Sequence, residues 1–192
     1  MILSNPFIEI SYYISPLLMK LFVIIMILLV FFGTFLDMIH KKNVKYFFEN
    51  AKKSKKSAIK NLSNTEKTSV IVKTVASDIL TTSELGAGKR RFAHLLGMYG
   101  TIIFWISSVV MIFCYSSFTS NTPILWPIMW HIGAIMTCVG GFWFWFFLRV
   151  DVFSEANPWY RIIKADLFVL ALLATSTSGL IWSLFQYFKI DI

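Results

Sequence analysis

Long runs of apolar residues divide this chain, and four of them are long enough to cross a membrane. A helix needs about 20 apolar residues to cross roughly 30 Å of hydrocarbon. The four runs cover residues 16–38, 92–116, 126–148 and 165–188. The third contains six consecutive aromatic residues, which lipid or a partner helix must cover. The pattern predicts an all-α integral membrane protein, with four transmembrane helices in a single membrane domain over residues 1–192.

Composition supports this class and favours a retained first helix. Hydrophobic residues make up 57% of the 192 residues, and the mean hydropathy is +0.68, more than a soluble domain carries. Residues 1–15 lack the basic start of a secretory signal, and residues 16–38 exceed the length of a signal's apolar core. We therefore expect no cleavable signal.

The basic residues predict the orientation of the helices. Of the 18 Lys and Arg residues, 13 lie in the loop 39–91, and three more lie between residues 149 and 164. Basic residues near helix ends are retained on the cytoplasmic side. Both loops are therefore predicted to be cytoplasmic and both termini outside, in the plasma membrane. This rule also accounts for the net charge of +8, and no interleaving of aromatic and basic residues indicates nucleic-acid binding.

The long cytoplasmic loop is predicted to contain helices of its own. Residues 43–61 have the pattern of a basic helix, whose lysines at 52–56 are suited to attract anionic lipid headgroups. A second helical pattern starts with Asn64 or Thr65 as N-cap and stops at Gly86. The second segment either lies in the membrane interface or forms a docking face for a cytosolic subunit. Its modest amphipathicity and low positive charge favour docking.

Several kinds of cofactor site have no sequence signature here. Cys114 and Cys138 fall at different depths of two helices, which argues against a disulfide. The chain has no C-x-x-C for an iron–sulfur cluster, no C-x-x-C-H for covalent haem and no Gly-rich phosphate loop. Asp37 and His40 are spaced for one helix face, but no third metal ligand accompanies them. Cluster or dinucleotide chemistry is therefore expected from another subunit.

Two histidines inside the predicted helices, His94 and His131, are the candidate cofactor-binding and metal-ligating residues. An imidazole within a bilayer needs a partner, which is either a neighbouring helix or a haem iron. Gly97 and Gly100 follow His94 and leave space for a porphyrin edge. Small residues at 140–141 and 175–179 allow helices, or a flat cofactor, to approach closely, with helix packing the favoured interpretation. Asp166 is expected to favour the start of the fourth helix through the helix dipole.

The chain also resembles a known family, from about Ser77 to Trp182. The resemblance rests on Asp78-Ile79-Leu80, on the segment from Arg91 to Gly100 containing His94, on an arginine after the third helix, and on the segment from Asp166 to Leu173. In these the chain resembles the membrane cytochrome b subunits of the nitrate reductase gamma type, including those of heterodisulfide reductase. The family holds b-type haem between helices and passes electrons between membrane quinone and a cytoplasmic iron–sulfur protein.

By this resemblance His94 matches a haem-ligating histidine of the family, whereas the family's opposing histidines come from a further helix. No histidine follows His131 in this sequence. Two imidazoles on one iron lie only about 4 Å apart. His94 is predicted near the cytoplasmic interface and His131 about 7 Å below the outer one, which leaves roughly 20 Å between them. If both are ligands, they serve different haems completed by other membrane subunits.

Two functions remain open at this point. The first is a membrane-anchor, cytochrome b-like subunit of a respiratory electron-transfer complex, with haem b, quinone as a redox partner, and a cytoplasmic iron–sulfur subunit docked on residues 44–85. The second is a haem-free accessory subunit of a larger membrane enzyme, which uses the same helices only for packing. A transporter is disfavoured because the predicted helices are unbroken and lack acidic residues in mid-membrane.

Overall fold

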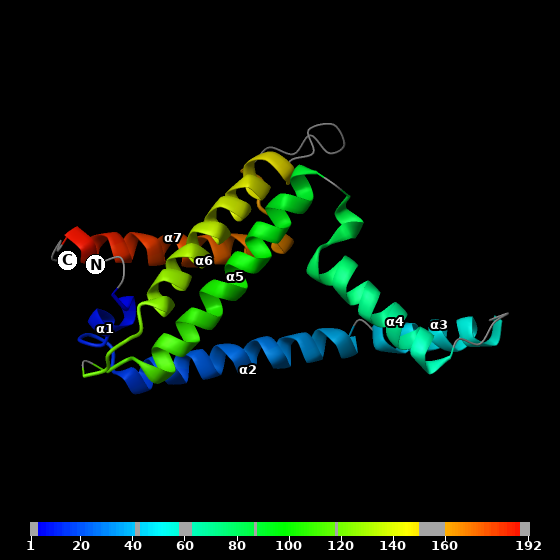
Figure 1. Ribbon diagram of the computed structural model, residues 1–192, viewed down its shortest axis with the longest axis horizontal. Coiled ribbons are helices and arrows are strands. Elements are labelled where there is room, and N and C mark those ends of the chain that lie inside the picture. The colour runs from blue at the N-terminus through cyan, green and yellow to red at the C-terminus, as the bar shows by residue number, and fades with distance from the viewer. Residues whose placement is uncertain are drawn as a thin grey trace. The chain divides into compact units, whose positions relative to one another are not determined.

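All regular elements in the part of the chain that the structure describes are helices. The computed structural model describes residues 4–40, 43–57, 63–86, 88–117, 119–149 and 160–188 (Figure 1). In chain order the elements are α1 (Pro6–Ile10), α2 (Pro16–His40), α3 (Asn43–Ser57), α4 (Asn64–Thr74), η1 (Val75–Leu80), η2 (Ser83–Leu85), α5 (Lys89–Cys114), α6 (Leu125–Trp143), η3 (Phe144–Leu148), η4 (Lys164–Asp166) and α7 (Leu167–Phe188).

Four helices are long and apolar enough to span a membrane, which confirms the predicted fold class at this level. They are α2, α5, α6 with its π-helical continuation η3, and α7. Their ends differ from the predicted ends by up to three residues, because α5 already begins at Lys89. That start places three basic residues in the first turn of the helix. Apolar periodicity detects the middle of a span better than its ends.

The chain divides into two compact units, which we describe separately. One unit contains Met1–Pro16 and Ser77–Ile192, and the other contains Leu17–Ala76. In the second unit, nearly all described side chains of α2, α3 and α4 are exposed. The N-cap of α4 is Ser63, not the predicted Asn64 or Thr65. Its hydroxyl accepts from the Glu66 amide at 3.3 Å, and the Glu66 carboxylate accepts from the Ser63 amide at 2.7 Å.

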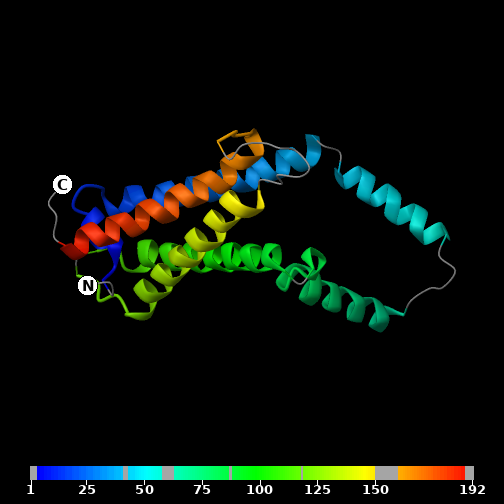
Figure 2. The ribbon, with the colours of Figure 1, turned by 90° about the horizontal axis from the view of Figure 1, so that it is seen from above.

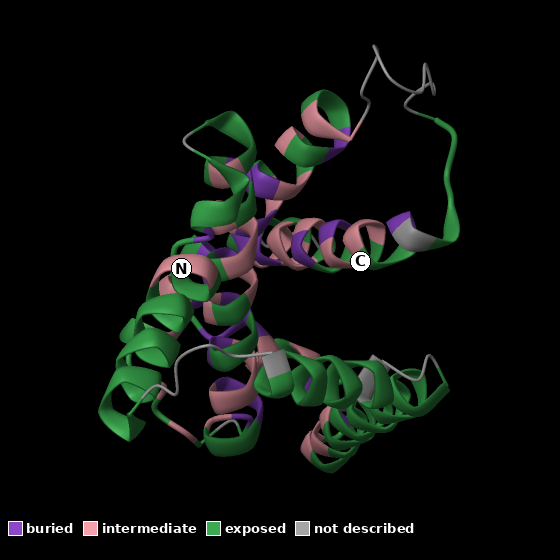
Figure 3. Cartoon of the chain, turned by 90° about the vertical axis from the view of Figure 1, so that its right-hand side faces the viewer, coloured by how far each residue is buried: buried purple, intermediate pink, exposed green. Residues whose placement is uncertain are grey.

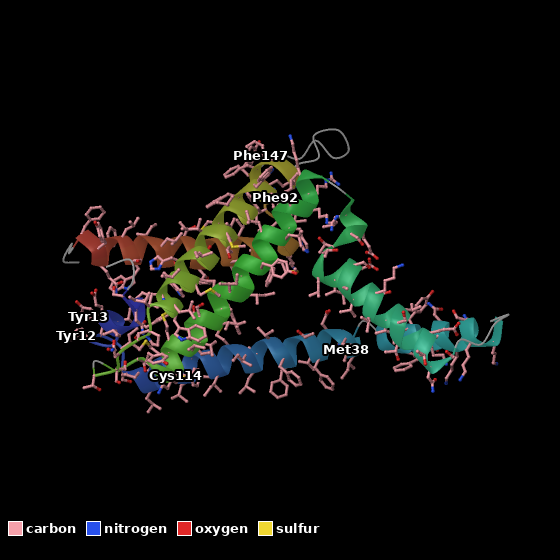
Figure 4. All side chains as sticks on the ribbon, viewed as in Figure 1. Tyr12, Tyr13, Met38, Phe92, Cys114 and Phe147 are labelled. Carbon is pink, nitrogen blue, oxygen red and sulfur yellow. The ribbon has the colours of Figure 1, made fainter. Side chains whose placement is uncertain are left out.

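Helices α5 and α6 form an antiparallel pair with very close backbones (Figure 1). A Cβ added to Gly140 would lie 2.5 Å from the Gly97 nitrogen, and one added to Gly133 would lie 2.5 Å from the Phe104 nitrogen. In Figure 4, Phe92 and Phe147 lie toward one end of the pair and Cys114 toward the other, as the antiparallel arrangement requires. Glycine is needed at positions 133 and 140 because backbone of the facing helix occupies the space.

Helix α7 packs on α6, and the core of the first unit lies where α5, α6 and α7 meet. Phe104, Met111, Trp130 and Ala134 form this core. Buried residues gather around it in Figure 3, whereas most of the chain is exposed. In a membrane the outward apolar side chains contact lipid, so small residues and hydrogen bonds must hold the helices together.

The short helix α1 closes one end of the three-helix bundle. Figures 1 and 2 both show it beside the last turns of α7. The Pro6 carbonyl accepts hydrogen bonds from the Trp182 indole at 3.2 Å and the Gln186 amide at 3.0 Å. The Asn5 amide donates to the Tyr115 carbonyl at 3.0 Å, and its side-chain oxygen caps α1. This arrangement has no counterpart in the sequence predictions.

Polar contacts at the opposite end join the start of α5 to the segment before it. The Tyr99 hydroxyl donates to the Leu80 carbonyl at 2.7 Å, and the Arg91 guanidinium donates to the Thr81 carbonyl at 2.7 Å. Hydrogen bonds from Ser83 and Ser77 hold the pKa of Asp78 below its usual value. The segment from Ser77 to Leu85 is therefore anchored to α5 by side-chain hydrogen bonds.

Candidate functional site

His131 lies in α6 and is buried against α7. Its Nδ1 is 2.7 Å from the Pro127 carbonyl oxygen, and its Nε2 is 2.7 Å from the Ser183 hydroxyl oxygen. A carbonyl only accepts, so Nδ1 carries the proton and Nε2 of the neutral ring accepts from Ser183. Both ring nitrogens therefore have partners within the helix bundle.

Aromatic packing fixes the imidazole of His131 further. The Trp130 ring meets it edge-on, with ring centroids 5.0 Å apart. The Trp130 indole in turn donates to the Ser108 hydroxyl at 3.0 Å, which ties α6 to α5. A ligating nitrogen lies about 2 Å from its metal. In this arrangement, iron ligation through Nε2 would require Ser183 to move out of its 2.7 Å contact.

His94 has the opposite environment. It is exposed on α5, one turn inside the basic start of the helix, and makes no hydrogen bond to any residue that the structure describes. Gly97 follows one turn later, and a Cβ added there meets no atom within 4 Å. Gly100 is different, since a Cβ there would lie 2.6 Å from the Thr137 nitrogen of α6. Of the two glycines predicted to make space beside His94, only Gly97 faces open space.

The register of α5 against α6 separates the two histidines along the bundle. Gly133 lies against Phe104 and Gly140 against Gly97, so His131 is level with about residue 106 of α5. His94 lies about 12 residues before that level, and a rise of 1.5 Å per residue makes the separation about 18 Å. This is close to the roughly 20 Å expected from the sequence. The described helices do not bring His94 and His131 to one iron.

Two small residues of α7, Ser176 and Gly179, pack against α6. Ser176 is fully buried, and the Cys138 thiol of α6 lies 3.2 Å from its hydroxyl. Gly179 lies under the Trp130 ring, where an added Cβ would be 3.1 Å from the nearest ring atom. Cys138 and Cys114 are both free thiols, as expected. At Ser176 and Gly179, side chains of α6 occupy the space beside α7.

A buried ion pair connects the end of α6 to the start of α7. The Arg149 guanidinium contacts both carboxylate oxygens of Asp166 and lies 4.1 Å above the Trp145 ring. The Ile163 amide also donates to Asp166, at 2.9 Å. The hydrogen bond from Arg149 holds the pKa of Asp166 below its usual value, and the same contact raises the pKa of Arg149.

Asp166 therefore has a larger role than the one predicted for it. It lies in the turn η4, directly before α7 begins at Leu167, and its carboxylate is bound by Arg149. Dipole compensation alone does not describe this arrangement, because a specific partner from α6 neutralises the charge. The sequence showed both residues but gave no sign that they meet.

Metal sites other than haem require a cluster of ligating side chains. Among the described residues, no group of three or more His, Cys, Asp or Glu side chains could hold a metal ion. A haem needs only one or two axial protein ligands, so a haem site is a separate question that rests on the individual histidines.

The residues that hold His131 and α1 were not among those predicted from the sequence. Ser183 was one of several hydroxyl residues in an apolar run, and nothing in its spacing marked it as the partner of a residue 52 positions away. Asn5 followed by Pro6 was a detectable signal, because an Asn N-cap before a proline in the first turn is typical of a helix start.

Comparison with known proteins adds no relative: no family model, no curated protein and no solved structure matches this chain.

Proposed function

We propose that this chain is a membrane-anchor subunit of a respiratory electron-transfer complex, in which His94 ligates a b-type haem. The observation that carries the proposal is the environment of His94: an exposed imidazole without a hydrogen-bond partner among the described residues, on a helix able to span a membrane. An imidazole in that position gains a partner by binding metal. Gly97 keeps the neighbouring surface of α5 open.

The proposed ligand set contains His94 and a second residue from another membrane subunit. His131 is left out, since both of its ring nitrogens bond to Pro127 and Ser183 and its level is about 18 Å away. We assign His131 to packing of α6 on α7. A bound haem would supply one-electron transfer, and His94 would hold it within an apolar surrounding.

In the complex, electrons pass between membrane quinone and a cytoplasmic iron–sulfur subunit. The proposed orientation has both termini outside and the two basic loops in the cytoplasm, as the distribution of Lys and Arg favours. The iron–sulfur subunit then docks on the cytoplasmic segment between α2 and α5, within residues 44–85. Under this proposal the chain transfers electrons and has no catalytic residue of its own.

The visible spectrum of the purified complex, recorded before and after dithionite reduction, tests the proposal. We expect a b-type signal in the wild type, its loss in His94→Ala, and its retention in His40→Ala, an exposed histidine that serves as the matched control. Subunit composition is measured in parallel, so that loss of haem is separated from loss of assembly. An unchanged spectrum of an intact His94→Ala complex would contradict haem ligation by His94.

A haem-free accessory subunit is the second candidate function. The observation that favours it is His131, a membrane histidine fully explained by helix packing. If His94 likewise bonds only to a neighbouring subunit, the chain anchors or orients a larger membrane enzyme without holding a cofactor. A purified complex with no b-type signal in the wild type would support this function over the first.

A further inference from the structure

Helix α3 carries Phe47 and Phe48 on one face and most of its lysines on another, while Tyr46 lies at the edge of the lysine face. At 3.6 residues per turn, Phe47, Phe48 and Ala51 fall within a sector of about 100°. The lysines at 45, 52, 53 and 56 occupy a second sector, centred about 140° away. The two phenylalanines are exposed, at 69% for Phe47 and 58% for Phe48. A soluble helix would bury these rings against a neighbour.

Chain connectivity places α3 next to a membrane span. Helix α2 ends at His40 and α3 begins at Asn43. Three peptide steps cover at most about 11 Å, so α3 starts within that distance of the end of α2. The headgroup region on each side of the hydrocarbon is several ångströms thick. If α2 spans the membrane, α3 begins at the level of the lipid headgroups.

We propose that α3 lies along the membrane interface, with its aromatic face among the acyl chains and its lysines on the headgroups of anionic phospholipids. Aromatic residues on one face and lysines on the other are the features of interfacial helices. The charge of the helix is complementary to an anionic lipid surface, since Glu49 is its only acidic residue and it faces Lys45 at 3.9 Å. Lys55, in the aromatic sector, reaches the headgroups through its long stem.

A lipid surface fits α3 better than a protein partner does. Four lysines cover a sector of about 100° away from the phenylalanines, and Lys55 lies between the two phenylalanines. This broad spread of positive charge suits a layer of negative charge more than a single docking groove. Helix α4 is less basic than α3, because its 11 residues contain two lysines, Lys67 and Lys73, and one acidic residue, Glu66. Its N-terminus also has a complete capping box. Docking of a cytoplasmic subunit would then use residues from α4 to η2 and leave α3 to the membrane. This inference does not depend on haem binding.

Fluorescent labelling of the full-length chain in vesicles tests the proposal. Cys114 and Cys138 are replaced by serine, and an environment-sensitive label is attached at Phe47→Cys or, as the opposite-face control, at Glu49→Cys. Each protein is reconstituted in phosphatidylcholine vesicles with and without phosphatidylglycerol. Quenching by acrylamide, which is uncharged, reports exposure to water, and quenching by lipids with a nitroxide near the headgroup reports insertion.

In anionic vesicles we expect the label at position 47 to be quenched several-fold more by the nitroxide lipid than the label at position 49, with the reverse order for acrylamide. Replacing the lysines at 52, 53, 55 and 56 by glutamine should remove most of this difference, and so should omission of phosphatidylglycerol. Equal acrylamide quenching at the two positions would overturn the proposal. Insertion that is the same with and without anionic lipid would overturn it as well.

Discussion

His131 is fixed between two helices through both of its ring nitrogens, and its bond to Ser183 can be removed selectively. The change Ser183→Ala leaves Nε2 buried without a donor. We expect a loss of about 1 kcal/mol in stability, because hydrogen bonds between transmembrane helices contribute about this much. The measurement is thermal unfolding of the purified protein in detergent.

The matched control for this prediction is Ser178→Ala on the same helix. Ser178 is exposed, and its hydroxyl donates only within α7, to the Thr175 carbonyl at 3.1 Å. Its removal should leave the melting temperature close to that of the wild type. Equal melting temperatures for Ser183→Ala and Ser178→Ala would show that the contact between His131 and Ser183 does not stabilise the bundle.

The ion pair of Arg149 and Asp166 predicts a defined pH dependence. Because Arg149 lowers the pKa of Asp166 below 3.8, the unfolded chain binds this proton more tightly than the folded chain does. The stabilisation is therefore complete above about pH 4 and is lost as the pH falls further. Asp166→Asn should be less stable than the wild type at pH 7, and the difference should shrink as the pH drops toward 3.

Unfolding midpoints of the two proteins between about pH 3 and 7 check this expectation. Asp37→Asn is a suitable control, since it removes one carboxylate from α2, outside the ion pair. It should leave the pH dependence of the first unit unchanged. A difference between wild type and Asp166→Asn that stays constant down to pH 3 would contradict the assignment of this titration to Asp166.

At the residue scale, the sequence identified the polar side chains that need a partner more reliably than it identified the partners themselves. His131 was a candidate because an imidazole in an apolar run is costly. Pro127 lies one turn before it on α6, but its other partner, Ser183, lies on α7, and that contact requires the register of α6 against α7. The same holds for Arg149 and Asp166, which were recognised individually and are joined only by the fold.

Among the helices, the closest contact is that of α5 with α6, and two facing glycines test it. A Cβ at Gly140 would lie 2.5 Å from the Gly97 nitrogen and 2.8 Å from the Ala93 carbonyl oxygen, whereas a Cβ at Gly97 meets nothing within 4 Å. Gly140→Ala must therefore push the helices apart and should cost about 1–3 kcal/mol. Gly97→Ala should be neutral or slightly stabilising, because alanine favours the helix.

Thermal unfolding of the two glycine variants tests whether glycine is required at position 140 by the close approach of the α5 backbone. If closeness of the backbones matters, Gly140→Ala melts well below Gly97→Ala, although the two substitutions are chemically identical. Similar melting temperatures for both would contradict the register described for α5 and α6.

At the element scale, the sequence predicted the four spans because each one repeats the same apolar signal over about 20 residues. It did not predict α1, which has five residues and too short a pattern for periodicity to detect. It also placed the start of α4 at the wrong cap, since Ser63, Asn64 and Thr65 are all favoured N-cap types. Only the position of Glu66, three residues after Ser63, distinguishes among them.

For the whole molecule, hydrogen bonds join different segments at each of the two ends of the bundle of α5, α6 and α7. One end joins Asn5 to the Tyr115 carbonyl and Pro6 to Trp182. The other end holds the ion pair of Arg149 and Asp166. The basic start of α5 lies at this second end too, because α5 and α6 are antiparallel. The bundle thus has one basic end and one end closed by α1, and under the proposed orientation the positive-inside rule predicts that the basic end is cytoplasmic.

Single-cysteine labelling in intact cells tests the resulting topology. In a chain without Cys114 and Cys138, we expect Ser120→Cys to react with a membrane-impermeant maleimide from outside, and Glu49→Cys to react only after the cells are opened. The reason is that Ser120 follows α5 at the end closed by α1, whereas Glu49 lies in α3, between α2 and the basic start of α5. Labelling of Glu49→Cys in intact cells would reverse the orientation. Labelling of both positions from outside would mean that α5, the candidate span between them, does not cross the membrane.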